Sequence, residues 1–210
     1  MQQETLTVGL GNRAYDIVIG PDLIDRAESI LGPIAAGRHI VIVSDKTVAT
    51  LYLDRLTSGL KIAARAIDHF AVTAGESSKS MTVLAKLLDD ILAVGVDRSV
   101  LLIAFGGGVV GDLAGFAAAS LLRGVDFVQI PTSLLAQIDS SVGGKTGVNA
   151  ASGKNLIGAF YQPKAVLADT SLLASLPGRE LRAGYAEMVK YGLLGDAAFF
   201  DWLEANSSAV

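Results

Sequence analysis

Apolar and polar residues alternate at the start of the chain in a pattern that is typical of paired strands. Residues 6–8 and 15–19 carry apolar side chains at every second position, and Gly11-Asn12 stands between the two segments. A period of two turns one face of a strand inward, and a glycine beside an asparagine favours a tight turn. The pattern therefore predicts an N-terminal β-hairpin.

After the hairpin, strand-like and helical patterns follow one another as far as residue 122. Apolar periodicity predicts helices at 23–31 (closed by Gly32-Pro33), 48–60, 81–94 and 113–122. Short apolar runs predict strands at 40–43, 69–72 and 100–105. These runs lack polar alternation, as do parallel strands covered on both faces. The succession favours an α/β fold, a Rossmann-like and mostly parallel sheet.

The pattern changes at residue 132. Small and polar residues occupy 132–163, so an irregular and functional segment is expected there. A last strand is predicted at 165–168, a helix at about 179–194 and another from 197. Leu176-Pro177-Gly178 is the candidate boundary between an α/β domain at 1–176 and the beginning of an all-helical domain at 177–210.

Composition narrows the functional classes. The 210 residues are 51% apolar and carry a formal net charge of -4, as in an ordinary globular protein, and no Lys/Arg cluster indicates nucleic acid or membrane as a partner. The chain lacks cysteine, so any zinc site must use histidine and carboxylates. No targeting segment and no apolar run of about 18 residues is visible, so the cytoplasm is the expected location.

Chemistry-bearing residues follow the predicted strands. Residues 106–112, Gly-Gly-Gly-Val-Val-Gly-Asp, follow one strand and open a helix, where backbone N–H groups can approach a pyrophosphate. The alternative is a tight strand-to-helix turn. Asp45, Glu76 and Lys79 also follow strands and could hold ribose hydroxyls or phosphate. The alternatives are a helix cap for Asp45 and a solvated loop for the others.

Further candidates lie in the second half. Lys145 and Lys154 stand on glycine-flanked loops and could converge on a phosphate or carboxylate, or could be solvated charges. Glu187 and Lys190 are three apart on a predicted helix, so they can reach one ligand together or form a surface ion pair. His39 and His69 show no metal-pair spacing, and structural or solvated roles are expected for them.

Four segments, at 106–112, 132–149, 153–163 and 184–192, resemble the 3-dehydroquinate synthase family, and the resemblance runs from about Gly75 to the end of the chain. It implies conversion of 3-deoxy-D-arabino-heptulosonate 7-phosphate to 3-dehydroquinate and phosphate, in the shikimate pathway. NAD would take a hydride from a ring hydroxyl, phosphate would leave by elimination, and hydride return, ring opening and aldol closure would follow. A homodimer is also implied.

The resemblance also implies site residues. The implied NAD contacts are Asp45, Gly75, Glu76, Lys79, Gly107, Gly108, Val109, Val110, Gly111, Asp112, Thr132, Ser133, Lys145, Lys154, Leu172 and Ser175. The implied substrate contacts are Asp139, Lys145, Asn155 and Lys190, with Arg123 reaching the phosphate from the neighbouring subunit. Glu187 would bind zinc, or cobalt, with two histidines from later in the family's chain; no histidine follows His69 here.

Departures from the family pattern, and three other functions, bear on this reading. Ala74, Ser77-Ser78 and Ser133 replace residues usual in the family. The family's helical domain is expected to be cut short, so turnover by these residues alone is not expected. Another sugar-phosphate cyclase, making valiolone-type or inosose-type rings, would differ at the Ser-Ser-Val-Gly-Gly-Lys block. A metal-dependent polyol dehydrogenase would accumulate NADH, and an NAD-binding fragment would not turn over.

Overall fold

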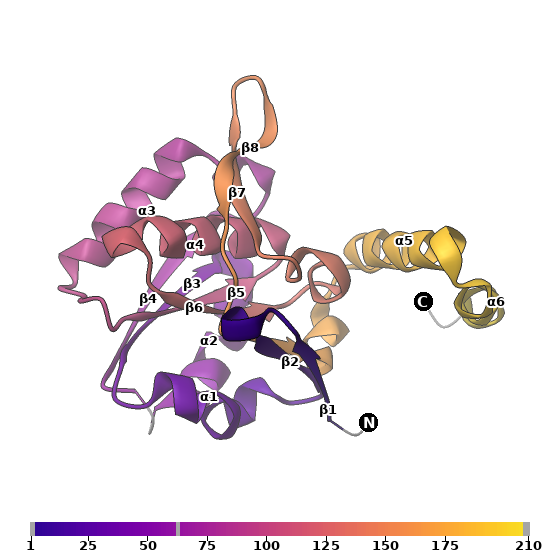
Figure 1. The fold of residues 1–210 in the computed structure, drawn as a ribbon, viewed down its shortest axis with the longest axis horizontal. Helices are drawn as coiled ribbons and strands as arrows, with labels where there is room; N and C mark the ends of the chain where they lie inside the picture. Colours follow the sequence, from indigo (N-terminus) through magenta and orange to yellow (C-terminus); the bar gives the residue numbers. More distant parts are fainter. Residues whose placement is uncertain (1–2, 62–63, 208–210) are drawn as a thin grey trace.

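The computed structural model describes residues 3–61 and 64–207 and shows an α/β body with two further helices extending from it (Figure 1). The body is built on a seven-stranded sheet in the order β1-β2-β9-β6-β5-β3-β4. Its strands are β1 (Glu4–Val8), β2 (Tyr15–Gly20), β3 (His39–Asp45), β4 (Ala66–Val72), β5 (Leu101–Gly106), β6 (Asp126–Pro131) and β9 (Ala165–Asp169). β1 and β2 form the expected antiparallel hairpin, and the other pairings are parallel. The predicted fold class is confirmed.

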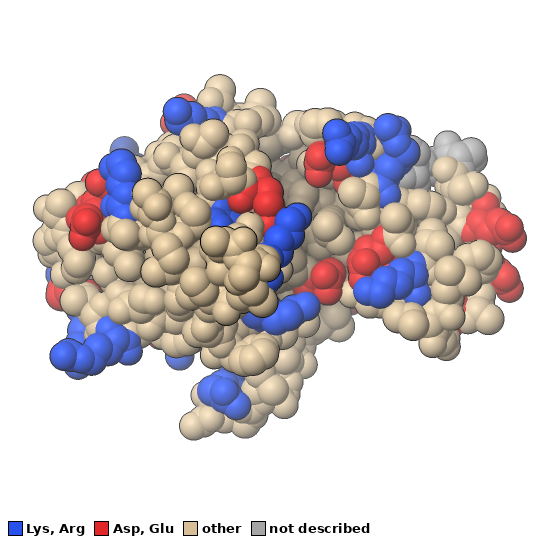
Figure 2. All heavy atoms as spheres, turned by 90° about the horizontal axis from the view of Figure 1, so that it is seen from above, with Lys and Arg blue, Asp and Glu red and all other residues tan. Residues whose placement is uncertain are grey.

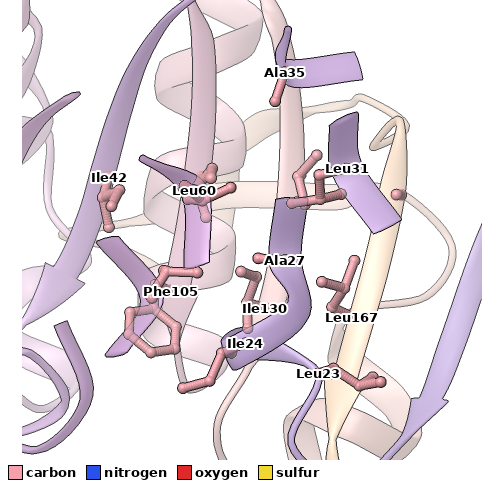
Figure 3. Close-up of a cluster of buried hydrophobic side chains, with 14 of the residues drawn as sticks. Leu23, Ile24, Ala27, Leu31, Ala35, Ile42, Leu60, Phe105, Ile130 and Leu167 are labelled. Atoms are coloured by element: carbon pink, nitrogen blue, oxygen red, sulfur yellow. The ribbon is translucent and has the colours of Figure 1, made fainter. Parts of the chain in front are cut away.

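Helices cover both faces of the sheet. They are α1 (Ala27–Ala35), α2 (Lys46–Leu60), α3 (Met81–Ala93) and α4 (Gly108–Ser120), with the short helices η1 (Gly11–Arg13), η2 (Ile24–Arg26), η3 (Glu76–Ser78), η4 (Leu121–Arg123), η5 (Ala136–Ser140) and η6 (Thr170–Ser175). Ile40 and Ile42 of β3 join the cluster beneath α1 and α2, which Figure 3 shows. Val41 and Val43 join the cluster beneath α3 and α4. Successive side chains of the strand are thus buried on opposite faces, which explains the missing polar alternation.

Two helix boundaries differ from the prediction. α1 begins at Ala27, not at 23, and runs through Pro33 to Ala35. Proline removes one backbone donor in the last turn, but Leu31 and Ala35 are fully buried, and their packing outweighs that loss. α4 begins at Gly108, not at 113, because the glycine-rich segment itself takes up helical conformation. The sequence pattern therefore placed the start of α4 too late.

The prediction of an irregular segment at 132–163 is wrong. It contains η5 and a hairpin of β7 (Lys145–Ala150) and β8 (Gly153–Phe160), which packs on α4 and projects from the body (Figure 1). A Cβ on Gly158 would lie only 2.0 Å from the Thr146 carbonyl oxygen, and one on Gly147 only 2.5 Å from that of Ile157. The small residues, which gave no strand-like pattern in the sequence, are thus what allows the backbones of β7 and β8 to approach each other. β6 also escaped prediction.

Two helices follow the body, α5 (Gly178–Gly195) and α6 (Ala197–Asn206), close to the predicted ranges. They extend sideways from the sheet (Figure 1), and Gly184 packs against Leu134 beside η5. Leu193, Leu194 and Trp202 are exposed on them. The division at residue 176 stays a proposal. In the part of the chain that the structure describes, no helix is long and apolar enough to cross a membrane.

An ion pair ties α2 to η2. Arg55 donates Nε to Asp25 Oδ1 at 3.0 Å and Nη2 to Asp25 Oδ2 at 2.5 Å, and the hydrogen bond from Arg55 lowers the pKa of Asp25 below 3.8. Asp25→Asn is expected to reduce the free energy of unfolding at neutral pH by about 0.5–1 kcal/mol, the range for a partly exposed pair. Because the folded-state pKa is depressed, the stabilisation is present above the unfolded pKa and is lost as the pH falls through the folded value.

Urea unfolding at neutral and at acidic pH measures this loss. Asp54→Asn, at an exposed position of α2, controls for the change in net charge. A loss of equal size at both pH values would show that the ion pair is not its cause.

Candidate functional site

The carboxyl ends of the parallel strands form one edge of the sheet, where open α/β folds bind their ligands. β3 ends at Asp45, β5 at Gly106, β6 at Pro131 and β9 at Asp169. The candidates that follow these strands therefore lie along one edge.

The glycine-rich turn forms a backbone cradle at the start of α4. Gly107 is the N-cap residue, and no side chain caps the first turn of this helix. A Cβ on Gly107 would lie 3.4 Å from Ser133 Oγ, and one on Gly108 would lie 2.9 Å from Ser140 Oγ. The N–H groups of a first helical turn point outward with the positive end of the helix dipole. The cradle suits an anionic group that approaches the backbone closely.

A buried lysine joins three segments beside this cradle. Lys79 is 5% exposed, and its Nζ donates to Asp112 Oδ2 and to Asn155 Oδ1, each at 2.5 Å. Burial raises the pKa of Asp112, while the hydrogen bond from Lys79 acts in the opposite direction. Asp112 belongs to α4 and Asn155 to β8, so Lys79 holds the cradle helix, its own loop and the hairpin together. It is not the solvated loop charge of the alternative interpretation.

The hairpin also contacts Glu76. Asn149 Nδ2 donates to Glu76 Oε1 at 2.8 Å, and Lys154 Nζ lies 3.9 Å from the same oxygen. Asn149 Oδ1 accepts from the backbone N–H of Asn155 at 2.9 Å. Asn149 stands in one of the family's segments, but nothing in its spacing in the sequence links it to residue 76.

A second group of charges lies between η5, β7 and α5. Lys145 Nζ is 3.8 Å from Asp139 Oδ1, and Tyr191 donates its hydroxyl to the same oxygen at 3.3 Å. Lys190 Nζ donates to Glu187 Oε1 at 2.7 Å, and this bond raises the pKa of Lys190. Figure 2 shows basic and acidic side chains on both sides of the hollow between the body and the two last helices.

A pocket connects the two groups. It has a volume of about 310 Å³ and is lined by Asp112, Lys145, Asn155 and hairpin residues that include Leu156 and Phe160. Burial raises the pKa of Asp112, and Lys145 is close enough to oppose part of that rise. A phosphorylated hydroxylated ligand would find here an ammonium group for its phosphate and an amide for its hydroxyls.

Several expected contacts are engaged elsewhere. Asp45 Oδ1 caps α2 by accepting from the N–H groups of Thr47 and Val48, at 2.8 and 3.1 Å, as the alternative reading expected. The side chains of Val110 and Leu172 are buried at 1% exposure and pack in the core, so only their backbones can face a ligand. Ser175 Oγ accepts from Tyr52 at 2.6 Å.

Arg123 follows the end of α4 that lies away from the cradle. It is exposed in η4 after the far end of α4 and precedes the amino end of β6. A helix of 13 residues spans roughly 20 Å, so Arg123 and the cradle stand at opposite edges of the sheet.

The two histidines pair within the sheet. His39 Nε2 lies 2.6 Å from Asp68 Oδ2, and His69 Nε2 lies 2.8 Å from Ser44 Oγ. Burial lowers the pKa of His69. The structural roles expected for both are confirmed. Within residues 3–61 and 64–207, no three His, Asp or Glu side chains are grouped closely enough to hold a metal ion.

The family model and the curated relatives that match this chain carry the same name. Residues 69–183 match the family model described as 3-dehydroquinate synthase N-terminal. The 3-dehydroquinate synthase of Rhodospirillum rubrum is 58% identical over 100% of this chain and 54% of its own length. That of Caulobacter vibrioides is 55% identical over 98% of this chain and 56% of its own. The chain spans about half the length of the curated relatives that it matches.

Solved structures agree in fold. A 2-epi-5-epi-valiolone synthase from Streptomyces hygroscopicus, with NAD+ and Zn2+ bound, is 35% identical over 93% of this chain and 54% of its own, with a TM-score of 0.84. A 2-deoxy-scyllo-inosose synthase, complexed with carbaglucose-6-phosphate, NAD+ and Co2+, is 30% identical over 89% and 50%, with a TM-score of 0.83. An iron-containing alcohol dehydrogenase, 15% identical over 90% and 53% with a TM-score of 0.72, shares the fold alone.

Proposed function

Because the chain belongs to the 3-dehydroquinate synthase family, we propose that it carries the NAD and phosphorylated-sugar sites of an enzyme converting 3-deoxy-D-arabino-heptulosonate 7-phosphate to 3-dehydroquinate and phosphate. One observation carries the proposal. The uncapped, glycine-lined start of α4 lies beside a pocket that presents Lys145 and Asn155. An anion-binding cradle thus adjoins a site for a second anionic, hydroxylated ligand.

The described residues fit NAD. The absent Cβ atoms of Gly107 and Gly108 leave room for a pyrophosphate on the first N–H groups of α4. Glu76 and Lys154 stand beside it and can bind ribose hydroxyls and phosphate. Bound NAD supplies a hydride acceptor for oxidation of a ring hydroxyl. The remaining proposed NAD contacts are Asp45, Gly75, Lys79, Val109, Val110, Gly111, Asp112, Thr132, Ser133, Lys145, Leu172 and Ser175.

The substrate would lie against the hairpin side of the cradle. In this proposal Lys145 attracts the phosphate, and Asn155 donates to and accepts from ring hydroxyls. Asp139 and Lys190, from η5 and α5, bind further groups of the sugar acid. These side chains act by holding the reacting carbon near the cofactor. Because the carbon is already held there, less entropy is lost on reaching the transition state.

A zinc site does not fit the described residues as they stand. Glu187 is paired with Lys190, and the part of the chain that the structure describes contains no group of three metal-binding side chains. Zinc takes four ligands, of which a catalytic site supplies three from protein. We retain Glu187 as the contribution of α5 to a metal site and assign no step to a metal.

We further propose a homodimer in which Arg123 serves the partner's pocket. Its placement at the opposite edge of the sheet, and the exposure of Leu156 (62%) and Phe160 (84%) on β8, support an interface between copies. A sedimentation experiment is expected to show a dimer that Phe160→Ser converts to monomer. A monomeric wild-type chain at micromolar concentration would contradict the proposal.

Calorimetry and a phosphate-release assay test the function. NAD+ is titrated into this chain, and phosphate and NADH are then followed with the heptulosonate phosphate, NAD+ and zinc; the R. rubrum relative is the positive control. Phosphate release without net NADH supports the cyclase. Net NADH would indicate a dehydrogenase instead, and absence of NAD+ uptake by the folded chain would refute the cofactor site.

A second candidate is an NAD-binding unit without turnover. The incomplete metal-ligand set among the described residues favours it. NAD+ uptake without phosphate release or NADH formation, under conditions where the positive control releases phosphate, is the result expected of such a unit.

A further inference from the structure

We propose that Asn149 is a positioning residue that couples the loop at residues 75–79 to Asn155, so that occupancy of the cofactor site orders the substrate side of the pocket. The inference rests on the proposed function, which places NAD against Glu76 and the sugar phosphate against Asn155. Neither the likeness to known proteins nor the sequence pattern assigns Asn149 a role.

Asn149 makes hydrogen bonds in three directions. Its Nδ2 donates to Glu76 Oε1 at 2.8 Å, and its backbone N–H donates to the Lys79 carbonyl at 2.9 Å. Its Oδ1 accepts from the backbone N–H of Asn155 at 2.9 Å. An amide is one of the few side chains that donates and accepts at the same time. Only one orientation of this amide satisfies both the carboxylate and the N–H, so its two ends are fixed.

Asn155 needs this support because of its backbone. Its φ is +57°, in the left-handed region that is disfavoured for residues with a side chain and that asparagine adopts when local hydrogen bonds support it. The Asn149 oxygen holds its N–H, and Lys79 Nζ holds its side-chain oxygen at 2.5 Å. Asn155 is otherwise exposed on β8. Its orientation toward the pocket therefore depends on two residues that also hold the loop at 75–79.

These contacts form a continuous path between the two sites. A ribose hydroxyl bound to Glu76 would restrict the Glu76 carboxylate, which in turn fixes the Asn149 amide and the N–H of Asn155. Sites coupled through such a shared element influence each other reciprocally. NAD+ alone is therefore expected to reduce the motion of β8, which contributes Asn155 and Leu156 to the pocket.

Hydrogen exchange with and without NAD+ tests the coupling. In the wild-type chain, NAD+ is expected to slow amide exchange at 107–112 and also at 153–158, by roughly tenfold, which corresponds to about 1.4 kcal/mol of local stabilisation. In Asn149→Ala, NAD+ is expected to slow exchange at 107–112 only. Asn12→Ala, an exposed asparagine in η1, is the matched control and is expected to behave as wild type.

A second variant keeps the test decisive if Asn149→Ala does not fold. Asn149→Asp is nearly isosteric and keeps the acceptor for Asn155, but it loses the donor to Glu76 and is expected to lose the slowing at 153–158 as well. Slowing at 153–158 that persists in either folded variant, or that is absent from wild type while 107–112 is slowed, overturns the role of Asn149. Absence of slowing at 107–112 in wild type refutes the NAD site itself, a separate result.

Discussion

Lys79→Met is expected to lower the free energy of unfolding at neutral pH by about 3 kcal/mol, because removing one partner of a buried ion pair leaves the other charge uncompensated. Methionine keeps the apolar stem, so the loss isolates the ammonium group. Lys79 is 5% exposed, and Asp112 and Asn155 Oδ1 both lose their donor. Urea unfolding followed by circular dichroism measures the change.

The stability of Lys79→Met should also change with pH in a definite direction. Burial already raises the pKa of Asp112, and Lys79 is the nearest group that opposes the rise. In Lys79→Met the folded-state pKa is therefore expected to rise further above the unfolded value. A raised carboxyl pKa stabilises the folded state below the unfolded pKa, and this contribution is lost as the pH rises through the folded value. The variant is thus expected to lose stability between mildly acidic and neutral pH.

Two controls separate this explanation from a general effect of losing a lysine. Lys86 pairs with Asp90 at 2.6 Å on α3, but its side chain is 75% exposed. Lys86→Met is expected to change stability by less than about 0.5 kcal/mol, as for exposed pairs one helical turn apart. Adding Asp112→Asn to Lys79→Met should recover most of the loss. A double variant as unstable as Lys79→Met would show that the unpaired carboxylate is not the cause.

Gly108→Ala is expected to weaken NAD+ binding on the order of a hundredfold while the chain remains folded. The new Cβ would stand in the cradle, and each charge-assisted hydrogen bond that it displaces from the pyrophosphate contributes about 1.5–3 kcal/mol. The same atom would lie 2.9 Å from Ser140 Oγ, so it also disturbs η5. Calorimetric titration with NAD+ gives the affinity.

Ser140→Ala distinguishes the two effects. In Gly108→Ala/Ser140→Ala the clash within the protein is relieved, but the Cβ still occupies the cradle, so binding should stay weak. Gly32→Ala is the matched control, because Gly32 also lies inside a helix and a Cβ there would meet no atom within 4 Å. Full recovery of NAD+ affinity in the double variant would place the pyrophosphate elsewhere.

Local pattern predicted the regular part of the fold well. The strands at 40–43 and 100–105 and the helices that follow them were found because burial on both faces leaves long apolar runs. The pattern failed at β7 and β8, where glycines replace apolar residues. There the strands are stabilised by the close approach of Gly147 and Gly158 and by packing on α4, which a propensity for strand does not describe.

The candidate site divides in the same way. Gly108, Lys145 and Asn155 were marked by their types and by their place in the family's segments. The contacts of such residues could not be predicted from the sequence. Lys79 and Asn155, for example, form a hydrogen bond but are 76 positions apart. Asn149 received no role for the same reason, and Arg123 was identified by resemblance alone.

The sequence by itself determined the α/β class, the strand ends that carry the candidate residues and the residue types that can bind an anion, since these depend on local periodicity and on side-chain chemistry. Only the tertiary structure decided that Lys79 is buried between Asp112 and Asn155, that Asp45 caps a helix, and that Asn149 joins two loops. Such contacts arise when the chain closes on itself, and their strength depends on burial, which no single residue encodes.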